Sequence, residues 1–185
     1  MHAGARTHAD AGKKYYDAGE NDRARKEYTL ALELDKKYAP ALAGLGMLDA
    51  REHKWKDAEK RIDDAIDRDD KIPDGFMARG VFIGEKNKGK DPEDWMEDAE
   101  KAFSKALKRD EKHSETWYRL GTVRQWGYKF REAGDAFRKV LDIDKGYTTP
   151  ANEAWARIQK IERSAPGTRV GKKIALVDSL TRSDA

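Results

Sequence analysis

The 185-residue sequence contains no cysteine. This absence excludes disulfide bonds, metal sites built on thiolates and cysteine nucleophiles, and it leaves the redox state of the compartment open. Long apolar runs are also missing, because the longest one, residues 40–48, includes two glycines and is too short to span a bilayer. The first twenty residues contain no apolar signal segment. We therefore expect a soluble chain without membrane insertion, located in the cytoplasm or in a bacterial cell envelope or periplasm.

A strong charge of one sign is absent as well. The chain has 38 basic and 35 acidic residues, so its net charge is only +3. Nucleic-acid-binding domains usually carry a localised basic excess, so this balance argues against a nucleic-acid partner. Apolar residues make up 38%. That share is low for a domain with one thick core and normal for a thin, two-layer helical array.

Residue sets typical of catalysis or metal binding are not found in the sequence. Its four histidines, His2, His8, His53 and His113, are not paired at a spacing of four and do not follow the spacing of a zinc site. A glycine-rich phosphate-binding loop after a strand and an EF-hand loop are both missing. We therefore expect no catalytic residue, no cofactor and no metal site, and a protein that is not an enzyme.

What the sequence does contain is a repeat of about 34 residues. Five series of similar residues recur at spacings of 34 or 41. One seven-residue insertion between Gly80 and Ala99 explains every departure from 34. The series are Gly12, Gly46, Gly80 and Gly121; Ala24, Ala58, Ala99 and Ala133; Tyr28, Ile62, Phe103 and Phe137; Ala31, Ala65, Ala106 and Val140; and Asp35, Asp69, Asp110 and Asp144.

An early glycine followed by alanine, a large apolar residue and alanine, at this period, resembles the tetratricopeptide repeat (TPR) family. The clearest copy is residues 117–121 with Ala133, Phe137 and Val140. The resemblance implies an all-α fold, a right-handed α-α superhelix of four helix pairs. The copies would be residues 5–38, 39–72, 73–113 with the insertion, and 114–147. We predict helices at 5–18 and 21–35, 39–52 and 55–69, 73–86 and 92–110, and 114–127 and 130–143.

The chemistry of the repeated positions agrees with this fold. Ala24, Tyr28 and Ala31 are spaced so that they share one face of a helix. The alanines are small where helices approach, and the large residue fills the space between them. Because glycine lacks a Cβ atom, the partner helix can approach the backbone of Gly46 or Gly121 closely.

Two segments follow the repeats. Residues 151–163 place Trp155 and Ile158 on one helical face, and we expect this helix to cap the last repeat, which completes an array over residues 5–163. Residues 164–185 form a basic and apolar tail, which could begin a further domain. Its last six residues, 180–185, are similar to the start of an S-layer homology domain. That resemblance suggests an alternative function, a structural or assembly module of a longer cell-envelope protein.

Some residues depart from the repeat pattern. His8, Asp49, Arg79 and Arg124 are polar where the family favours apolar or aromatic residues. The insertion, residues 86–91, is rich in Lys, Asn and Gly, which indicates an exposed loop. It could be a tolerated surface loop or a basic finger that reaches for a partner.

In the resembled family, the first helices of successive pairs line a concave groove. Positions out of phase with the packing stripe face this groove, and here they are small and apolar in the middle and aromatic at the C-terminal end. Aromatic residues and methionine suit a protein-recognition surface. The residues expected to bind a partner are Lys13, Tyr16, Ala43, Met47, Met77, Val81, Tyr118, Thr122, Gln125 and Trp126.

One subclass of the family holds a C-terminal carboxylate with lysine, asparagine and arginine on this face. Of the matching positions in this chain, only Lys13 is basic. The better ligand is therefore an apolar helix or extended segment. We expect a protein–protein interaction scaffold that binds a protein or peptide and is itself a monomer or weakly self-associating.

Overall fold

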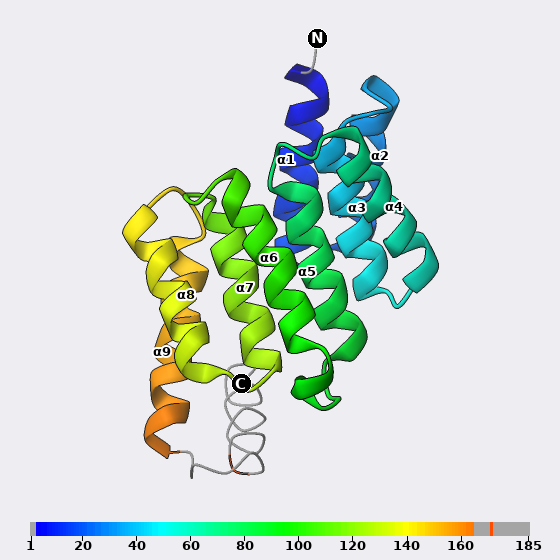
Figure 1. The fold of residues 1–185 in the computed structure, drawn as a ribbon. Helices are drawn as coiled ribbons and strands as arrows, with labels where there is room; N and C mark the ends of the chain where they lie inside the picture. The colour runs from blue at the N-terminus through cyan, green and yellow to red at the C-terminus, as the bar shows by residue number, and fades with distance from the viewer. Residues whose placement is uncertain (1–2, 165–170, 172–185) are drawn as a thin grey trace.

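The computed structural model describes residues 3–164 and Gly171 (Figure 1). Their regular secondary structure is helical, with nine α-helices and one short 3₁₀-helix, η1. Eight helices form four pairs, and α9 (Thr148–Ser164) follows the last pair. The pairs are α1 (Ala3–Asp17) with α2 (Asn21–Leu34), α3 (Ala39–Arg51) with α4 (Trp55–Arg68), α5 (Asp74–Asn87) with α6 (Met96–Arg109), and α7 (Ser114–Trp126) with α8 (Phe130–Ile143).

The helix pairs lie close to the predicted bounds, with two differences. Helix α9 begins at Thr148 rather than at residue 151. Pro150 is tolerated there because backbone N–H groups in the first turn make no hydrogen bond within the helix. Helix α6 begins at Met96 rather than at residue 92. Residues 92–94 instead form η1 (Pro92–Asp94), in which the side chain of Asp91 accepts a hydrogen bond from the backbone N–H of Glu93.

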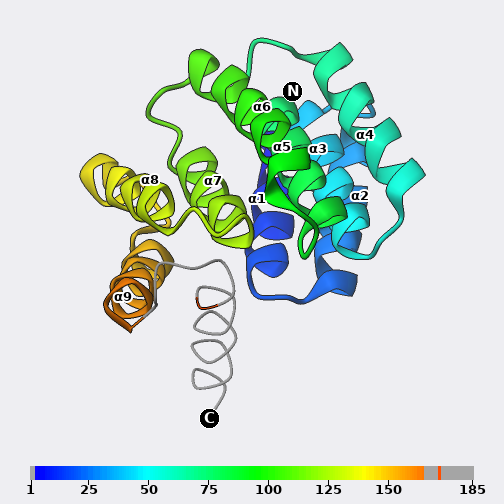
Figure 2. The ribbon, with the colours of Figure 1, turned by 60° about the horizontal axis from the view of Figure 1, so that its bottom comes forward.

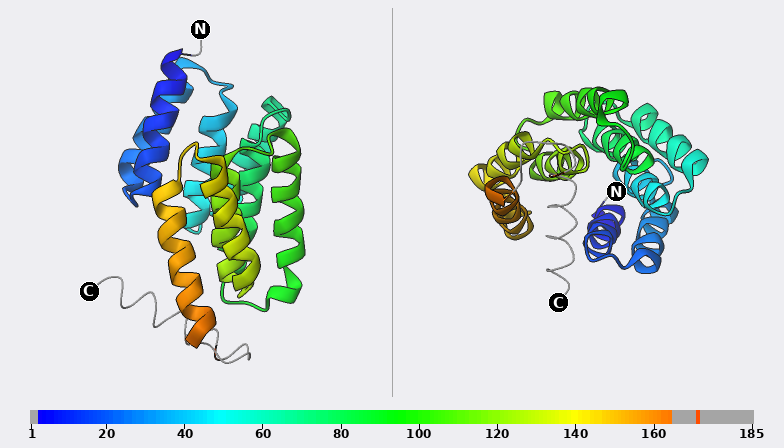
Figure 3. Two further views of the ribbon diagram at one scale, coloured as in Figure 1. Left: turned by 90° about the vertical axis from the view of Figure 1, so that its left-hand side faces the viewer. Right: turned by 90° about the horizontal axis from the view of Figure 1, so that it is seen from below.

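The pairs follow one another around an arc (Figure 3). Helices α1, α3, α5 and α7 lie on the inner side of this arc, and α2, α4, α6 and α8 lie on the outer side. The inner helices line the concave face. Helix α1 lies next to α7 across that face (Figure 2), although two complete pairs separate the two helices in the sequence.

Within each pair the recurrent glycine faces the large residue of the same copy. A Cβ atom placed on Gly121 would lie only 2.6 Å from Cε1 of Phe137, which is fully buried. The glycine therefore allows an approach that any side chain would obstruct. The four matched pairs are Gly12 with Tyr28, Gly46 with Ile62, Gly80 with Phe103, and Gly121 with Phe137.

The buried apolar side chains form two clusters. The larger one runs through the first three pairs and includes Leu120 and Val123 of α7. The smaller one joins α8 to α9, where Ile158 and Ile161 are buried, and the partly buried Trp117 packs against both clusters. Helix α9 therefore covers the exposed side of the last pair, as a capping helix must. None of the helices among the described residues is both long and apolar enough to cross a membrane.

The insertion in the third pair is exposed at every residue of 86–91 except the partly buried Asn87, as predicted. Lys86 and Asn87 extend α5, and Trp95, which the repeat pattern leaves without a packing position, is only 3% exposed. Lys88 lies 5.0 Å from the ring centroid of Trp126, and its Nζ is 2.5 Å from Oε2 of Glu85. This lysine is thus held against α5 and α7 rather than directed away from them.

The polar residues that depart from the repeat pattern are engaged in ion pairs. Asp49 is 1% exposed, and its carboxylate oxygens lie 2.8 Å from Nη2 of Arg25 and 2.7 Å from Nε of Arg61. The other three also pair with a charged residue of a neighbouring helix, although the His8 contact is an ion pair only when His8 is protonated. Their partners are Glu27 for His8, Asp63 for Arg79, and Glu100 for Arg124.

Two of these ion pairs occupy equivalent positions with reversed charge. Arg25 of the first copy pairs with Asp49 of the second. The repeat spacing places Glu100 of the third copy at the position of Arg25, and Arg124 of the fourth at the position of Asp49. Nε of Arg124 lies 2.9 Å from Oε1 of Glu100. The same contact between successive copies is thus made twice with opposite signs.

Candidate functional site

The ten residues predicted to bind a partner all lie on the inner helices α1, α3, α5 and α7. Five of them are buried, each with an exposed fraction of 1–3%: Tyr16, Ala43, Met47, Met77 and Val81. The other five are partly exposed, and four of those lie on α7: Lys13, Tyr118, Thr122, Gln125 and Trp126. The apolar middle of the concave face is therefore covered and not an open groove, whereas its aromatic end is accessible. That these residues contact a partner stays a prediction.

The apolar middle is covered because α1 and α7 are joined across the concave face. Nζ of Lys13 lies 2.7 Å from Oε2 of Glu115, and Asp17 forms an ion pair with Arg119. The hydroxyl of Tyr147, in the turn before α9, donates a hydrogen bond of 2.8 Å to Oδ2 of Asp17. We call these five residues the α1–α7 charge cluster. It connects the first helix pair to the last.

The local sequence explains how the charge cluster forms. Lys13 and Asp17 are four residues apart on α1, so they share one face of that helix. Glu115 and Arg119 are four apart on α7, and Nη2 of Arg119 lies 3.0 Å from Oε1 of Glu115. The order of charges is basic then acidic on α1 and acidic then basic on α7. When the two faces meet, each charge therefore lies opposite one of the other sign.

Aromatic rings surround the guanidinium group of Arg119. Its Cζ lies 5.0 Å from the ring centroid of Tyr16, 5.6 Å from that of Tyr118 and 5.5 Å from that of Tyr147. The rings of Tyr118 and Tyr147 stack at 5.1 Å. A cation over ring faces, shielded from water, gains more from cation–π attraction than an exposed one. These rings therefore help to hold Arg119 beside the two carboxylates.

Tyr147 joins this arrangement with an unusual backbone. Its φ is 61°, in the left-handed region that residues other than glycine rarely adopt. The conformation costs on the order of 1 kcal/mol. In return, the phenol ring stacks on Tyr118 and its hydroxyl reaches Asp17.

The surroundings shift the ionisation of the cluster. Burial alone would raise the pKa of Glu115, but the charges of Lys13 and Arg119 outweigh it and lower this pKa from 4.5 to about 2. Burial would likewise lower the pKa of Lys13, yet Glu115 raises it above its ordinary value. Both groups are therefore charged at neutral pH, and the contact between α1 and α7 is ionic.

Two cavities lie beside the inner helices, and Asp10 and Lys13 line both of them. The cavity of about 400 Å³ is lined by the apolar middle, including Ala43, Met47 and Met77. The other cavity, of about 740 Å³, is lined by residues of α1, α3, α7 and the start of α9. We call the larger one the concave cavity. Its lining residues are Asp10, Lys13, Lys14, Asp17, Arg51, Tyr118, Arg119, Thr122, Tyr147 and Pro150.

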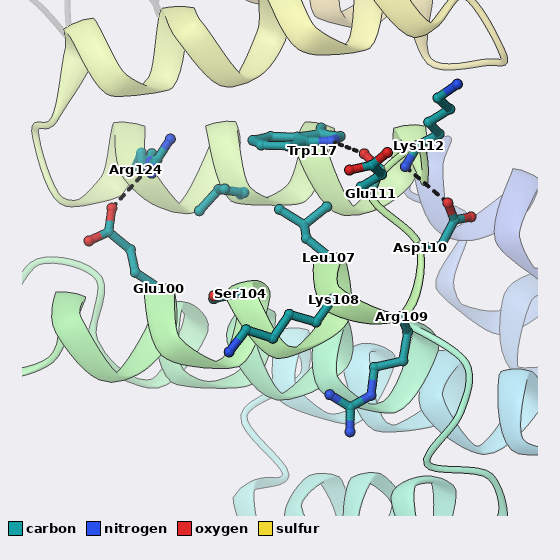
Figure 4. Close-up of a pocket in the computed structure, with 11 residues that line it drawn as sticks. Glu100, Ser104, Leu107, Lys108, Arg109, Asp110, Glu111, Lys112, Trp117 and Arg124 are labelled. Carbon is teal, nitrogen blue, oxygen red and sulfur yellow. Dashed lines mark hydrogen bonds and ion pairs between the residues drawn. The ribbon is translucent and has the colours of Figure 1, made fainter.

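A third cavity lies on the outer side, between α6 and α7 (Figure 4). Its volume is about 760 Å³, and the side chains of Leu107, Trp117 and Leu120 form its apolar part. The indole Nε1 of Trp117 donates a hydrogen bond of 2.8 Å to the carbonyl oxygen of Glu111. The ion pair between Glu100 and Arg124 crosses the far end of this outer cleft (Figure 4).

Within residues 3–164 and at Gly171, no group of three or more His, Asp or Glu residues is arranged to hold a metal ion. His8 and His113 are engaged separately, His8 with Glu27 and His113 with the hydroxyl of Thr116. His2 and residues 180–185, on which the S-layer resemblance rests, lie outside the described residues.

Most of the charge cluster was not predicted from the sequence. Lys13 was predicted from its repeat position, but Asp17, Glu115, Arg119 and Tyr147 were not. A signal was present, because two pairs of opposite charge, spaced by four residues and reversed in order, lie on inner helices of the first and last copies. That these copies meet depends on the curvature of the whole array, which no single repeat contains.

No protein-family model and no curated protein matches the chain. Several solved structures are similar. TTC0263, a thermophilic TPR protein of Thermus thermophilus, has a TM-score of 0.68 at 14% identity, over 96% of this chain and 90% of that chain. PilF of Pseudomonas aeruginosa has a TM-score of 0.57 at 21% identity, over 97% of this chain and 76% of that chain. The MamA protein has a TM-score of 0.51 at 18% identity, over 100% of this chain and 94% of that chain.

These similarities concern the fold. They confirm the predicted all-α architecture, a right-handed superhelix of four TPR-type helix pairs followed by a capping helix. Function has to be argued from the site itself.

Proposed function

We propose that this chain is a scaffold that binds an extended or helical segment of another protein on its concave face, without catalysis. The observation that carries the proposal is the concave cavity of about 740 Å³, which combines an aromatic wall with hydrogen-bonding and charged groups. Binding sites are typically concave, with a few polar groups that fix the orientation of the ligand.

The lining of the concave cavity indicates the chemistry of the segment. Four of its side chains are cationic, Lys13, Lys14, Arg51 and Arg119, whereas two, Asp10 and Asp17, are carboxylates. Arg51 donates hydrogen bonds to the carbonyl oxygen of Tyr16 and to the side chain of Asn21, which are neutral groups. Lys13 and Arg119 are already paired with Glu115 and Asp17, so Lys14 and Arg51 are the cations that an acidic side chain of the partner would complement.

The neighbouring surface of α7 suits the apolar part of such a segment. Tyr118 and Thr122 line the cavity, and Gln125 and Trp126 continue along the same helix. Aromatic side chains provide a large contact area at low entropic cost, and they are enriched where proteins meet. We therefore assign partner contact first to these four residues of α7 and to Lys13.

The experiment is affinity capture from the source organism with this chain as bait. In the test variant, Thr122→Glu and Gln125→Glu place two carboxylates on the accessible part of α7, where they would repel an acidic segment. Both positions are partly exposed, so the helix should be preserved, whereas charged residues at the buried Met47 and Met77 would disrupt the core. We expect the test variant to lose the captured protein while its far-UV circular dichroism is unchanged.

A matched control carries one glutamate on the outer side of the array. Ser104 is exposed on α6, so Ser104→Glu adds the same kind of side chain away from the concave face. Capture by this control should equal capture by the unmodified chain. Equal capture by the Thr122→Glu/Gln125→Glu variant would contradict the proposed site.

A further inference from the structure

The α1–α7 charge cluster differs from an ordinary buried ion pair in how its charges are distributed. Lys13, Glu115, Arg119 and Asp17 alternate in sign along a chain of three contacts, with two residues from each helix. Each helix therefore carries one acid and one base, four residues apart.

This distribution makes the contact reversible. Breaking a buried ion pair is usually costly because a charge is left without a partner. If α1 and α7 separated, Glu115 would keep Arg119, which it already contacts at 3.0 Å, and Asp17 would lie within reach of Lys13 on the same helix. Asp49 is different, because its partners Arg25 and Arg61 both lie on other helices.

The contact also hides a surface suited to recognition. Ala43, Met47, Met77 and Val81 are buried, with exposed fractions of 1–3%. The first three line the smaller concave cavity together with Lys13 and Glu115. Methionine side chains are flexible and polarisable, so they adapt to varied partners. We call these four residues the apolar strip.

The fold provides a place where the array could open. The outer cleft of about 760 Å³ lies between α6 and α7 (Figure 4). The core itself divides inside the last pair, because Leu120 and Val123 of α7 belong to the larger cluster and most buried side chains of α8 to the smaller one. The outer cleft is therefore the feature that separates part of α7 from the preceding copy. Rotation of the last pair about the outer cleft would carry α7 away from α1, because rigid-body rotation about an interface is a common form of conformational change.

From these observations we infer that the charge cluster is a latch between α1 and α7. In the free protein the latch is closed and covers the apolar strip, and a partner segment reaches the strip only after the two helices separate. The inference rests on the proposed function and adds the apolar strip to the surface that the partner segment would contact once the two helices separate.

The test exploits the absence of cysteine, because one introduced thiol can be followed without background. Met77→Cys places a thiol in the apolar strip, and Ile62→Cys places one in the core of the second pair, where Ile62 faces Gly46. The rate of reaction with a soluble disulfide reagent measures how often each position is exposed.

Each thiol variant is studied in three backgrounds. The first has the natural latch. The second carries Lys13→Glu with Asp17→Lys, which keeps an acid and a base on α1 but places like charges opposite Glu115 and Arg119. The third adds Glu115→Lys with Arg119→Glu, which restores opposite charges throughout. Far-UV circular dichroism checks that all variants are folded, and Asp17→Asn is a milder replacement if the second background is not.

We expect the second background to raise the reaction rate of the thiol at position 77 by about tenfold or more, because like charges replace attractive pairs across the helices. The third background should return the rate toward that of the first, and the thiol at position 62 should react at a similar rate in all three. An unchanged rate at position 77, or an equal increase at position 62, would overturn the latch. Since no partner is added, these results are independent of whether the proposed binding function is correct.

Discussion

The sharpest quantitative prediction concerns Glu115, the most deeply buried member of the latch. Glu115→Gln keeps the size and shape of the side chain and removes its charge. The side chain is 2% exposed and pairs with both Lys13 and Arg119. The substitution therefore removes two attractive contacts at once while leaving the packing of α7 in place.

The expected loss of stability follows from the ionisation of this carboxyl group. Its pKa falls from 4.5 to about 2 on folding. Each unit of difference between the folded and unfolded pKa corresponds to about 1.4 kcal/mol, so the charged form stabilises the folded state by about 3 kcal/mol. For a chain of this length, that loss lowers the melting temperature by about 6–12 °C at pH 7.

The pH dependence identifies the cause. A carboxyl group with a depressed folded pKa contributes its full stabilisation above the unfolded pKa, here 4.5, and loses it as the pH falls toward the folded pKa, about 2. The difference in melting temperature between the unmodified chain and the Glu115→Gln variant should thus be constant from pH 7 to about pH 5 and fall below half by about pH 3. Thermal unfolding followed by circular dichroism at several pH values measures it.

The matched control is Glu97→Gln. Glu97 also forms an ion pair with a residue four positions further along its helix, because Nζ of Lys101 lies 2.8 Å from its Oε1 atom. Both of these side chains are exposed. Surface pairs of this kind contribute little, so its melting temperature should not change measurably. The reasoning would be refuted if Glu115→Gln melted like the unmodified chain at pH 7, or if its deficit were the same at pH 3 as at pH 7.

Two further predictions test the packing of the copies. Gly121→Ala should lower the free energy of unfolding by about 1–2 kcal/mol, because the new Cβ would lie 2.6 Å from Phe137. Gly134→Ala should raise the free energy of unfolding by about 0.5–1 kcal/mol, because no atom lies closer than 3.6 Å to a Cβ at that position. Urea denaturation of the two variants measures these opposite changes, and a loss of stability in both would contradict the account of the glycines. Glu100→Arg should destabilise the array by placing like charges beside Arg124 and Lys129, and adding Arg124→Glu should recover part of the loss. A double-mutant cycle should show a coupling of about 0.5–3 kcal/mol, and additive effects would mean that the two residues do not interact.

The repeat was predictable from sequence because each copy carries its own packing rule. The glycine of the first helix and the large residue of the second recur at fixed distances, and in the structure the two meet in every pair, as in Gly121 with Phe137. The start of the second helix was predicted correctly at Asn21, Trp55 and Phe130, but in the third pair, next to the insertion, it was expected at residue 92 and lies at Met96. Local spacing is sufficient for contacts within a pair.

The state of the concave face was not predictable in this way. Helical phase correctly placed Met47 and Met77 on inner helices, but phase does not tell whether a distant helix covers them. The cover depends on the contact between α1 and α7, which the curvature of three successive junctions brings about. Trp95 illustrates a second limit, because the equivalent residues of the other copies, Glu20, Lys54 and Lys129, are charged and give no indication that this side chain is buried.

The departures from the repeat were read as weak points of packing and proved to be ion pairs. Asp49 and Arg124 occupy equivalent positions that usually hold an aromatic residue, and each meets a charged partner from the preceding copy. One position alone looks like an imperfection in the pattern. Its partner becomes evident only when two neighbouring copies are compared.

These reversed charges have a consequence for how such a gene can change. If recombination joined the first copy directly to the fourth, Arg25 would face Arg124, and if the third copy were followed by the second, Glu100 would face Asp49. Both rearrangements keep the 34-residue period and yet bring like charges into a buried junction. Charge complementarity at these two junctions therefore distinguishes the natural order of the copies from either rearrangement, although the helices themselves would be unchanged.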